Sequence, residues 1–214
     1  MAARKRERLK SPVSSRQQRP PADPVELRII GGALRGRKLR YNGDPAVRPM
    51  KDRVREAVFN LIGPAVRGKH AVDLFAGTGA LGLEAISRGA VKATLIEQHF
   101  PTARVIAENI AALDLDDQAE LLATNVFLRA LWQDRLGKVP WLVFCSPPYA
   151  FYVDRKADML GLVGHLIQAA PADSIFVVES DDRFDFQSLP DPDAWDVRRY
   201  PPAVVGVYRK ADEG

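Results

Sequence analysis

From residue 71 onward, short apolar runs alternate with helical stretches, and this alternation constrains the fold more than any other feature of the chain. The runs lack the polar alternation of half-exposed strands, so each is expected to be a strand covered on both faces. The repeated order of strand, helix and strand predicts a mostly parallel sheet with right-handed crossovers and helices on both faces. The predicted strands are Val72–Phe75, Ala93–Ile96, Glu120–Ala123, Trp141–Cys145 and Ile175–Val178.

Helix signals and two further strands complete this plan. A helix over Ala80–Arg88 ends at Gly89, and the next helix begins at Pro101, which matches the residue preferences of helix ends and starts. Trp195–Tyr200 and Val204–Tyr208 are predicted as two more strands, which brings the sheet to seven. The predicted fold class is therefore α/β, with a Rossmann-like, mostly parallel seven-stranded sheet.

The charge distribution divides the chain into unlike parts. The 214 residues carry a net charge of +4. Residues 1–55 hold 16 of the 31 basic residues and 5 of the 27 acidic ones, a net of +11, which leaves the remainder at −7. A strongly basic part favours a polyanionic partner, with a merely solvated tail as the alternative for residues 1–21. We expect a disordered basic arm over residues 1–24, a docking part over residues 25–63 and the main domain over residues 64–214.

The docking part contains two predicted elements. Leu27–Ile30 and Leu34–Leu39 flank Gly31-Gly32 and predict a small basic β-hairpin. Asp52–Ile62 is predicted as a helix whose apolar face is formed by Val54, Val58, Leu61 and Ile62. The rest of this helix is expected to show charge to the solvent through Arg53, Arg55 and Glu56.

Composition also excludes several classes of protein. The chain has no run of 18 or more apolar residues and no apolar signal near its N-terminus, so we expect a cytoplasmic protein without a membrane partner. Its one cysteine, Cys145, excludes an internal disulfide framework. His70, His99 and His165 do not cluster with Cys145 at metal-ligand spacing, so no metal is expected. A monomer is expected.

The first predicted strand runs into a glycine-rich turn that opens a helix. Gly77 and Gly79 let backbone approach a ligand, because a Cβ there would occupy the ligand's space. With Gly82 they also match G-x-G-x-x-G, which is typical of nicotinamide dinucleotide sites. Asp73 favours S-adenosylmethionine instead, since its carboxylate would repel a pyrophosphate but attract a cationic amine or sulfonium. The residues predicted to bind this cofactor here are Asp73, Phe75, Ala76, Gly77, Thr78 and Gly79.

Two later residues extend the predicted cofactor site. Glu97 ends the second strand, where its carboxylate can accept hydrogen bonds from both ribose hydroxyls, a role common to both cofactor classes. Asn125 follows the third strand at the position of an adenine edge, with an ordinary loop cap as the alternative. For Asp73 and Glu97 the alternative is a solvated carboxylate at a strand end.

A second loop comes directly after the buried strand Trp141–Cys145. Ser146-Pro147-Pro148-Tyr149 lies at the carboxyl end of the sheet, where open α/β sheets bind ligands. The prolines are expected to turn backbone carbonyls outward, and Tyr149 to offer a face on which a base stacks. Acceptors that hold the N–H groups of an exocyclic amine would turn it toward a sulfonium methyl. The predicted catalytic residues are Ser146, Pro147, Pro148 and Tyr149, with a plain Pro-Pro turn as the alternative.

From Arg28 to Tyr208 the chain resembles the RsmD-type family of ribosomal RNA guanine-N2 methyltransferases. The resemblance implies the class I methyltransferase fold, S-adenosylmethionine as methyl donor, the N2 amine of a guanine in 16S ribosomal RNA as acceptor, and an assembling small subunit as physical substrate. The basic part would then bind RNA through Arg28, Arg35, Arg37, Lys38, Arg40, Arg48 and Arg53. The matching segments are Arg28–Gly32, Arg35–Leu39, Arg48-Pro49, Asp52–Glu56, Phe59-Asn60, Asp73–Ala85, Ser87–Ala90 and Glu97.

Ser146 departs from the family pattern, which has Asp or Asn at this position. A serine hydroxyl has a shorter reach and neither a charge nor a carbonyl, so exchange of Ser146 for Asn or Asp is expected to raise the methylation rate. The departure also favours one alternative, a catalytically weak RNA-binding assembly factor. An adenine-N6 DNA methyltransferase shares the loop chemistry, but the chain lacks a separate target-recognition domain. A nicotinamide oxidoreductase rests on the glycine pattern alone.

Overall fold

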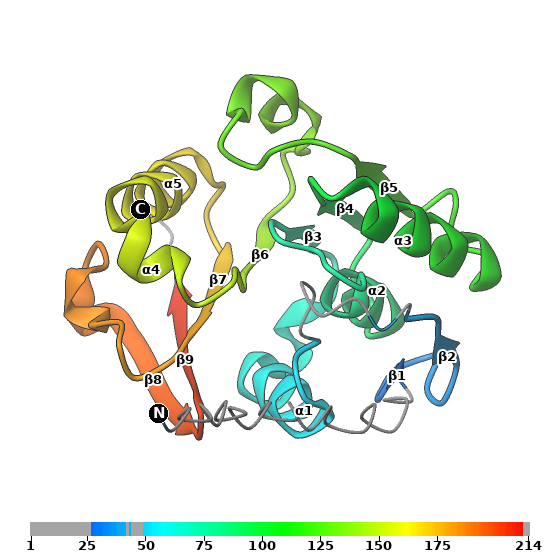
Figure 1. Cartoon of the computed structure of the whole chain (residues 1–214), viewed down its shortest axis with the longest axis horizontal. Helices are drawn as coiled ribbons and strands as arrows, with labels where there is room; N and C mark the ends of the chain where they lie inside the picture. The colour runs from blue at the N-terminus through cyan, green and yellow to red at the C-terminus, as the bar shows by residue number, and fades with distance from the viewer. Residues whose placement is uncertain (1–26, 42, 44–48, 212–214) are drawn as a thin grey trace, which may run out of the picture.

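The structure, a computed structural model, describes residues 27–41, 43 and 49–211, so the expectations for residues 1–24 and for Arg48 lie outside the described residues. One seven-stranded sheet runs through the molecule in the order β5-β4-β3-β6-β7-β9-β8, beside a small β1-β2 pair (Figure 1). The strands are β1 (Leu27–Arg28), β2 (Lys38–Leu39), β3 (His70–Asp73), β4 (Lys92–Ile96), β5 (Ala119–Leu122), β6 (Trp141–Cys145), β7 (Ile175–Ser180), β8 (Trp195–Tyr200) and β9 (Ala203–Arg209).

The sheet is parallel from β5 to β7 and antiparallel at its other edge. β3 pairs in parallel with β4 and β6, β4 with β5, and β6 with β7. β9 pairs antiparallel with both β7 and β8. The register sets Asp73 level with Leu95 of β4 and Phe144 of β6, so the carboxyl ends of these strands open onto one edge. The predicted α/β fold with a mostly parallel sheet of seven strands is confirmed.

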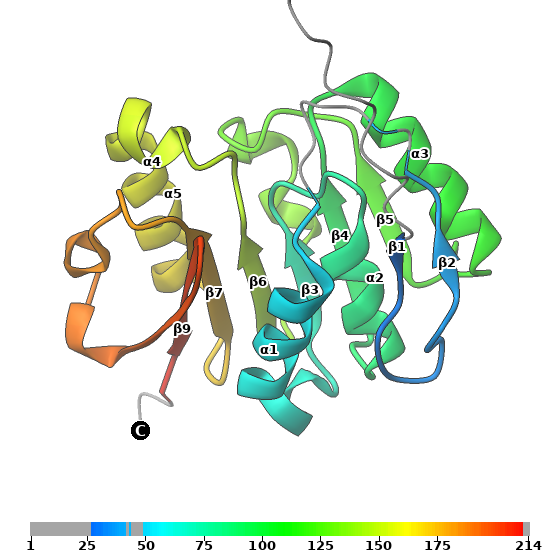
Figure 2. The ribbon, with the colours of Figure 1, turned by 60° about the horizontal axis from the view of Figure 1, so that its bottom comes forward.

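Helices cover both faces of this sheet, as predicted (Figures 1 and 2). Phe144 of β6 belongs to the core shared with α1, α2 and α3, whereas its neighbours Val143 and Cys145 belong to the core beneath α4 and α5. This alternation is the two-residue period of a strand buried on both sides. The helices are α1 (Asp52–Ile62), α2 (Ala80–Ser87), α3 (Phe100–Ala112), α4 (Phe151–Asp154) and α5 (Lys156–Ala169), with short 3-10 turns η1 (Gly63–Val66), η2 (Arg129–Leu131), η3 (Gln133–Arg135), η4 (Phe186–Ser188) and η5 (Pro192–Ala194).

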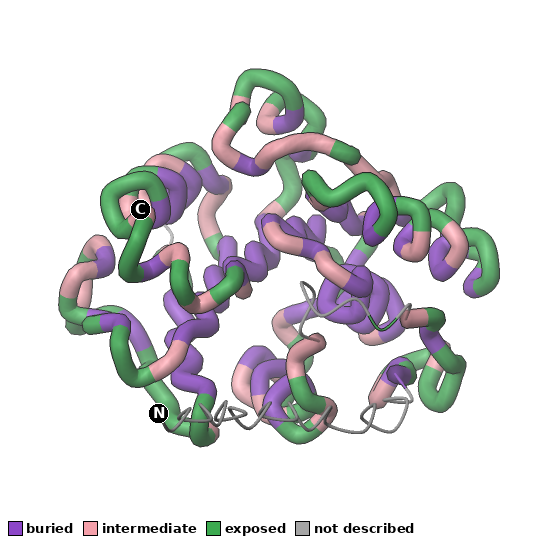
Figure 3. The backbone as a smooth tube through the Cα atoms, viewed as in Figure 1, coloured by how far each residue is buried: buried purple, intermediate pink, exposed green. Residues whose placement is uncertain are grey.

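The core is centred on β3, β6 and β7, whose residues are buried throughout (Figure 3). α1 contributes Phe59, whose ring centroid lies 5.6 Å from that of Phe144. Full burial of such a side chain stabilises the fold by about 1.5–3 kcal/mol. The docking part therefore shares the core of the sheet rather than lying apart from it.

The predicted hairpin forms, but its strands are only two residues long. Leu27 pairs with Leu39 and Arg28 with Lys38. The N–H of Ile29 still donates across the hairpin to the carbonyl of Arg37 at 2.9 Å. The pairing ends there because the N–H groups of Ile30 and Gly31 donate to the carboxylate of Glu84 in α2 at 2.7 and 2.8 Å. The turn of the hairpin is thereby attached to a helix of the main domain.

The bounds of α1 agree with the prediction, but the prediction for Arg55 is wrong. The side chain of Arg55 is fully buried rather than exposed. Its Nη2 donates to the carbonyl of Arg28 at 2.6 Å and to Oδ1 of Asp52 at 3.0 Å, and its Nε lies 3.7 Å from Oε2 of Glu84. The hairpin covers the side of α1 that the helical pattern left to solvent, which is why local periodicity could not place this residue.

Five strands of the sheet differ from their predicted bounds: β4, β5 and β9 by one residue at one or both ends, and β3 and β7 by two residues. β3 begins two residues earlier than predicted, at His70, which pairs with Lys92 and Trp141 on either side. β7 extends two residues further than predicted, to Ser180, because β9 pairs with it along its whole length. This extension places Glu179 inside the strand, next to the end of β6.

Candidate active site

The glycine-rich turn after β3 and the loop after β6 meet in one pocket. β3 and β6 are direct neighbours in the sheet, so the turn after Asp73 lies beside the loop after Cys145. Met50, from the segment before α1, also enters the pocket, and the sequence pattern did not single it out. The lining residues are Pro49, Met50, Phe75, Ala76, Gly77, Thr78, Ala80, Leu81 and Ser146.

The glycine-rich turn depends on backbone conformations that favour glycine. Gly77 and Gly79 have φ angles of 53° and 78°, in the left-handed region. A Cβ on Gly79 would lie 3.2 Å from Leu95 and 3.3 Å from Ile106, which are core side chains. The sequence predicted that a Cβ on Gly79 would fill the ligand's space, and this reason is corrected. A Cβ there would point into the core, and glycine is needed because the turn has a left-handed backbone conformation at this position.

Asp73 lies buried beneath this turn. Its Oδ2 accepts a hydrogen bond from the N–H of Gly82 at 3.1 Å, while Oδ1 is buried without a hydrogen-bond partner among the described residues. Burial and, to a smaller extent, the charge of Glu97 raise the pKa of Asp73 to about 7, while the hydrogen bond from Gly82 opposes the rise. A buried acceptor with one unused oxygen suits a cationic ligand group, which would stabilise the ionised carboxylate.

Glu97 holds the turn from the next strand. Its Oε2 accepts from the N–H of Gly77 at 2.9 Å, and its Oε1 accepts from the N–H of His99 at 2.8 Å. Each carboxylate oxygen has two lone pairs, so Glu97 can still accept hydrogen bonds from hydroxyl groups of a ligand. The structure thus gives Glu97 a role in shaping the loop, and its binding of a ribose stays a prediction.

Asn125 caps its own loop, which was the alternative to adenine binding in the sequence analysis. Its Oδ1 accepts from the N–H of Phe127 at 2.9 Å, two residues along the chain. This turn presents the ring of Phe127 toward Phe75, with centroids 6.3 Å apart. Adenine binding by the remaining amide of Asn125 stays a prediction.

Three phenylalanines located after β3, β5 and β6 form an aromatic cluster at this edge of the sheet. The centroid of Phe75 lies 6.0 Å from that of Phe151, and that of Phe127 lies 6.5 Å from Phe151. The guanidinium of Arg155 lies 3.9 Å from the centre of the Phe127 ring. Only Phe75 was predicted at the site. In the sequence, an aromatic residue follows each of these strands within a few positions. This pattern predicts a cluster only when the order of the strands in the sheet is known.

The loop after β6 is anchored by a residue that sequence reasoning missed. The hydroxyl groups of Ser146 and Tyr149 both donate to the carboxylate of Glu179, the latter at 2.7 Å. Glu179 is buried, and this burial raises its pKa, while the two hydrogen bonds oppose the rise. The available signal was an acidic residue inside an apolar strand, near its carboxyl end.

The carbonyl groups of this loop point partly inward. The carbonyls of Pro148 and Tyr149 accept from the N–H groups of Phe151 and Tyr152 at 2.8 and 3.2 Å, which forms the turn into α4. The expectation that the prolines turn carbonyls outward is therefore wrong at Pro148. Pro147 is buried and Pro148 exposed.

Most of the predicted RNA-binding cations are exposed, and several also contact the protein. Arg40 forms an ion pair with Glu108 at 3.0 Å, and Arg37 donates to the carbonyl of Ala112 at 2.6 Å. Arg28 lies 3.7 Å from the carboxylate of Asp52, and Arg53 donates to the carbonyl of Pro201 at 3.3 Å. Arg35 and Lys38 are exposed on the hairpin.

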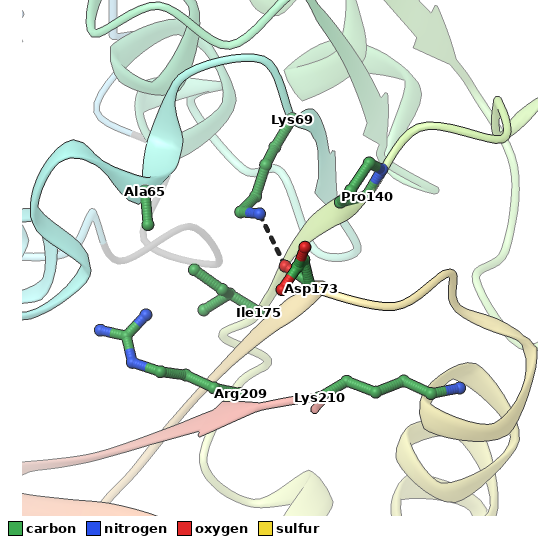
Figure 4. A pocket seen from close by; sticks show the side chains of 7 residues that line it. All are labelled: Ala65, Lys69, Pro140, Asp173, Ile175, Arg209 and Lys210. Atoms are coloured by element: carbon green, nitrogen blue, oxygen red, sulfur yellow. Dashed lines mark hydrogen bonds between the residues drawn. The ribbon is translucent and has the colours of Figure 1, made fainter. Parts of the chain in front are cut away.

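A second pocket lies at the opposite edge of the sheet, where β3, β6 and β7 begin (Figure 4). Its cations bind backbone carbonyls. Lys69 donates to the carbonyl of Asp173 at 2.6 Å, Arg209 to the last turn of α1, and Lys210 to the end of α5. Such contacts satisfy carbonyls at helix ends. This pocket is therefore structural, and it is remote from both loops. It is lined by Ala65, Lys69, Pro140, Asp173, Ile175, Arg209 and Lys210.

Neither a membrane span nor a metal centre is found in the described ranges. No described helix is long and apolar enough to cross a bilayer. Across residues 27–41, 43 and 49–211, no group of three His, Cys, Asp or Glu side chains could hold a metal ion.

Comparison with known proteins adds independent findings. A family model described as conserved hypothetical protein 95 matches residues 27–199. The ribosomal RNA small subunit methyltransferase D of Escherichia coli K12 is 40% identical over 124 residues, which cover 58% of this chain and 61% of that protein. The aligned part thus spans about three fifths of that relative.

Two solved structures share the fold. The Escherichia coli protein YhhF, described as a candidate methyltransferase, is 29% identical, with a TM-score of 0.69 over 88% of this chain and 99% of that chain. A 16S rRNA N2 methyltransferase of T. thermophilus, solved with AdoMet and guanosine, is 22% identical, with a TM-score of 0.62 over 78% of this chain and 44% of that chain. The second likeness concerns the fold alone.

Proposed function

The chain belongs to the family described as conserved hypothetical protein 95, and from this membership and the geometry of the site we propose that it is an S-adenosylmethionine-dependent methyltransferase of small-subunit ribosomal RNA. The resemblance to RsmD-type proteins in the sequence is confirmed by the match and by the Escherichia coli relative. The proposed acceptor is the exocyclic N2 amine of a guanine in 16S ribosomal RNA, within an assembling small subunit.

One observation carries the proposal. The glycine-rich turn and Ser146 line the same pocket at the carboxyl edge of the sheet. A cofactor held by the turn and a base held by the Ser146 loop would therefore meet there. Holding two reactants in this way lowers the entropic part of the barrier.

The residues around the turn fit the proposed cofactor. Bound S-adenosylmethionine supplies an electrophilic methyl group on a cationic sulfonium. Asp73 offers a buried carboxylate oxygen without a partner among the described residues, which suits a cation and would repel a pyrophosphate. Glu97 stands level with the turn, where it can accept from ribose hydroxyls. These charges favour S-adenosylmethionine over a nicotinamide dinucleotide.

The loop after β6 supports an amine acceptor. Ser146 places a hydroxyl oxygen in the pocket, and Tyr149 is fixed at its hydroxyl end, which leaves its ring in a defined orientation. An oxygen that accepts from the N–H groups of an amine can turn the amine toward the methyl group. The guanine N2 atom is proposed because the resemblance to the RsmD-type family implies it; the name of the Escherichia coli relative supports the coarser statement, a methyltransferase of small-subunit ribosomal RNA.

The hairpin and α1 would bind the RNA. Residues 1–55, which include the hairpin and the start of α1, carry a net charge of +11. The hairpin and α1 lie on the same side of the sheet as α2, which opens from the glycine-rich turn (Figure 2). Contacts with phosphates release counterions and supply affinity that does not depend on sequence. Base-specific recognition would then rest with the pocket.

The proposal is tested by methyl transfer to a panel of acceptors. The protein is incubated with radiolabelled S-adenosylmethionine and free 16S ribosomal RNA, assembled small subunits or duplex DNA. We expect label in ribosomal RNA, with the assembled subunits the best substrate. Label in DNA adenine would favour the DNA methyltransferase, and binding of subunits without any transfer would favour the assembly factor. Either result contradicts the proposal.

A further inference from the structure

A buried carboxylate lies beside the acceptor loop without a neutralising cation. Glu179 is 5% exposed, and its pKa responds to burial and to hydrogen bonds rather than to any Lys or Arg of the described chain. Its two oxygens accept from the hydroxyl groups of Ser146 and Tyr149. Burying an unpaired charge costs free energy, so packing alone does not explain a glutamate at this position.

The hydrogen bonds of Glu179 determine how Ser146 can bind a substrate. A serine hydroxyl has one proton, and here that proton points to Glu179. Toward any further partner, the oxygen of Ser146 is therefore an acceptor. Its bond to a carboxylate polarises the hydroxyl and strengthens it as an acceptor. Ser146 and Glu179 together thus offer the amine a strong hydrogen-bond acceptor, as a single Asp or Asn side chain would.

We propose that Glu179 is the positioning carboxylate of the methyl-acceptor site, acting on the amine through Ser146 and on the base through Tyr149. The inference rests on the proposed function and adds a residue to it. The acceptor that the family pattern places in the loop as an Asp or Asn is supplied here by Ser146 together with a carboxylate of the neighbouring strand β7, in which Val178, next to Glu179, is level with Cys145 at the end of β6.

The same geometry provides a route for the proton that the amine must lose. As the nitrogen forms its bond to the methyl carbon, the carbon–sulfur bond breaks and its electron pair stays on sulfur. The nitrogen becomes cationic and releases one N–H proton to the oxygen of Ser146. The proton of Ser146 passes at the same time to Glu179, which becomes neutral and later releases it to water. Ser146 ends unchanged, so charge and atoms balance.

This arrangement reverses part of the expectation for position 146. An Asp there would stand directly against Glu179, and two adjacent carboxylates do not both ionise readily. One would keep a proton at neutral pH, so Ser146→Asp alone is expected to slow transfer. Removing the charge of Glu179 would relieve the conflict. Ser146→Asn adds no charge and is the matched control. It is still expected to raise the methylation rate.

Five proteins test the proposal: the wild type, Glu179→Gln, Ser146→Asp, the control Ser146→Asn, and the double variant that combines Glu179→Gln with Ser146→Asp. Single-turnover methylation of assembled small subunits is measured across pH. S-adenosylhomocysteine affinity and thermal unfolding report whether each variant keeps its fold and cofactor site. Infrared spectroscopy reports protonated carboxyl groups independently of activity.

We expect Glu179→Gln to lower the rate by about 10²-fold and to remove the rise of rate with pH that ionisation of Glu179 produces, with S-adenosylhomocysteine affinity unchanged. Ser146→Asp should be slower than the wild type and gain a protonated-carboxyl band, and the double variant should lose that band and exceed both single variants. Wild-type rates in Glu179→Gln, or a double variant slower than both single variants, would overturn the inference. A wild type that methylates no RNA would overturn the proposed function itself, and this inference with it.

Discussion

Asp73 combines two properties that oppose each other. It is buried beneath the glycine-rich turn, which raises its pKa to about 7, yet the proposed ligand is a cation that needs it ionised. In the unfolded chain an aspartate has a pKa of about 3.9. The folded protein therefore holds a proton that the unfolded chain loses between about pH 4 and 7, and the contribution of Asp73 to stability falls as the pH rises through this window.

We expect the free energy of unfolding of the cofactor-free protein to decline by up to about 1.4 kcal/mol per pH unit between about pH 4 and 7 through this residue. Asp73→Asn should remove that part of the decline. Affinity for S-adenosylmethionine should rise with pH over the same range in the wild type, because the ionised form binds the cation. Chemical denaturation and calorimetry at pH 5 and 8 check both; equal pH dependence in the two proteins would contradict the role given to Asp73.

Gly79 is constrained by the fold itself. Its φ of 78° is costly for a residue with a Cβ, by about 1–3 kcal/mol, and a Cβ would also crowd Leu95 and Ile106. Gly79→Val should therefore lower the melting temperature and abolish S-adenosylmethionine binding by displacing the turn.

Gly36→Val is the matched control for Gly79→Val, because Gly36 has a φ of 84° but open space around its Cβ position. It should lower stability less and leave cofactor affinity intact. Titration calorimetry of both variants separates conformation from crowding. In the wild type, saturable NADH binding would count against the cofactor assignment.

Among the elements, α2 connects the docking part to the main domain through Glu84. This carboxylate is fully buried and accepts from the amides of Ile30 and Gly31 and from Nε of Arg88 at 2.7 Å, with Arg55 nearby. Breaking a buried charge network leaves its other members unpaired. Glu84 thus joins both the hairpin and α1 to α2, while Ser87 of α2 adds hydrogen bonds to the hairpin alone.

Glu84→Gln should destabilise the protein by about 3–5 kcal/mol, because it removes the buried charge that faces both Arg55 and Arg88 and leaves Arg55 with Asp52 alone. Hydrogen exchange should increase first at the amides of Ile30 and Gly31. Glu108→Gln, which breaks the exposed ion pair with Arg40, should cost less than about 1 kcal/mol. Similar losses in the two variants, measured by urea denaturation, would argue against a central role for Glu84.

The elements also show what the sequence can predict. Apolar runs and helix signals are local, so the seven strands, the bounds of α1 and the loops after β3 and β6 could be predicted from them. Arg55 and Glu179 could not, because their partners come from elements distant in the sequence. The bounds of β7 likewise depend on its pairing with β9. Long-range pairing, rather than local pattern, decided each of these differences.

On the scale of the whole molecule, the charge asymmetry separates the two binding tasks. Residues 1–55 carry a net +11 and the remainder a net −7. Removal of residues 1–24 should weaken RNA binding and flatten its dependence on salt, because fewer counterions are released. Affinity for S-adenosylmethionine should stay nearly the same. Filter binding at several salt concentrations measures the slope, and an unchanged slope would mean that the arm is only a solvated tail.

The central claim is that this molecule transfers a methyl group to a guanine N2 amine of the small subunit. Its most direct test is mass analysis of nucleosides from 16S ribosomal RNA after reaction of assembled, unmethylated small subunits with the protein and S-adenosylmethionine. We expect N2-methylguanosine, about one per subunit as for a single target base, and its absence with Gly79→Val. A methyl group on another base or another guanine atom, or none at all, would contradict the claim.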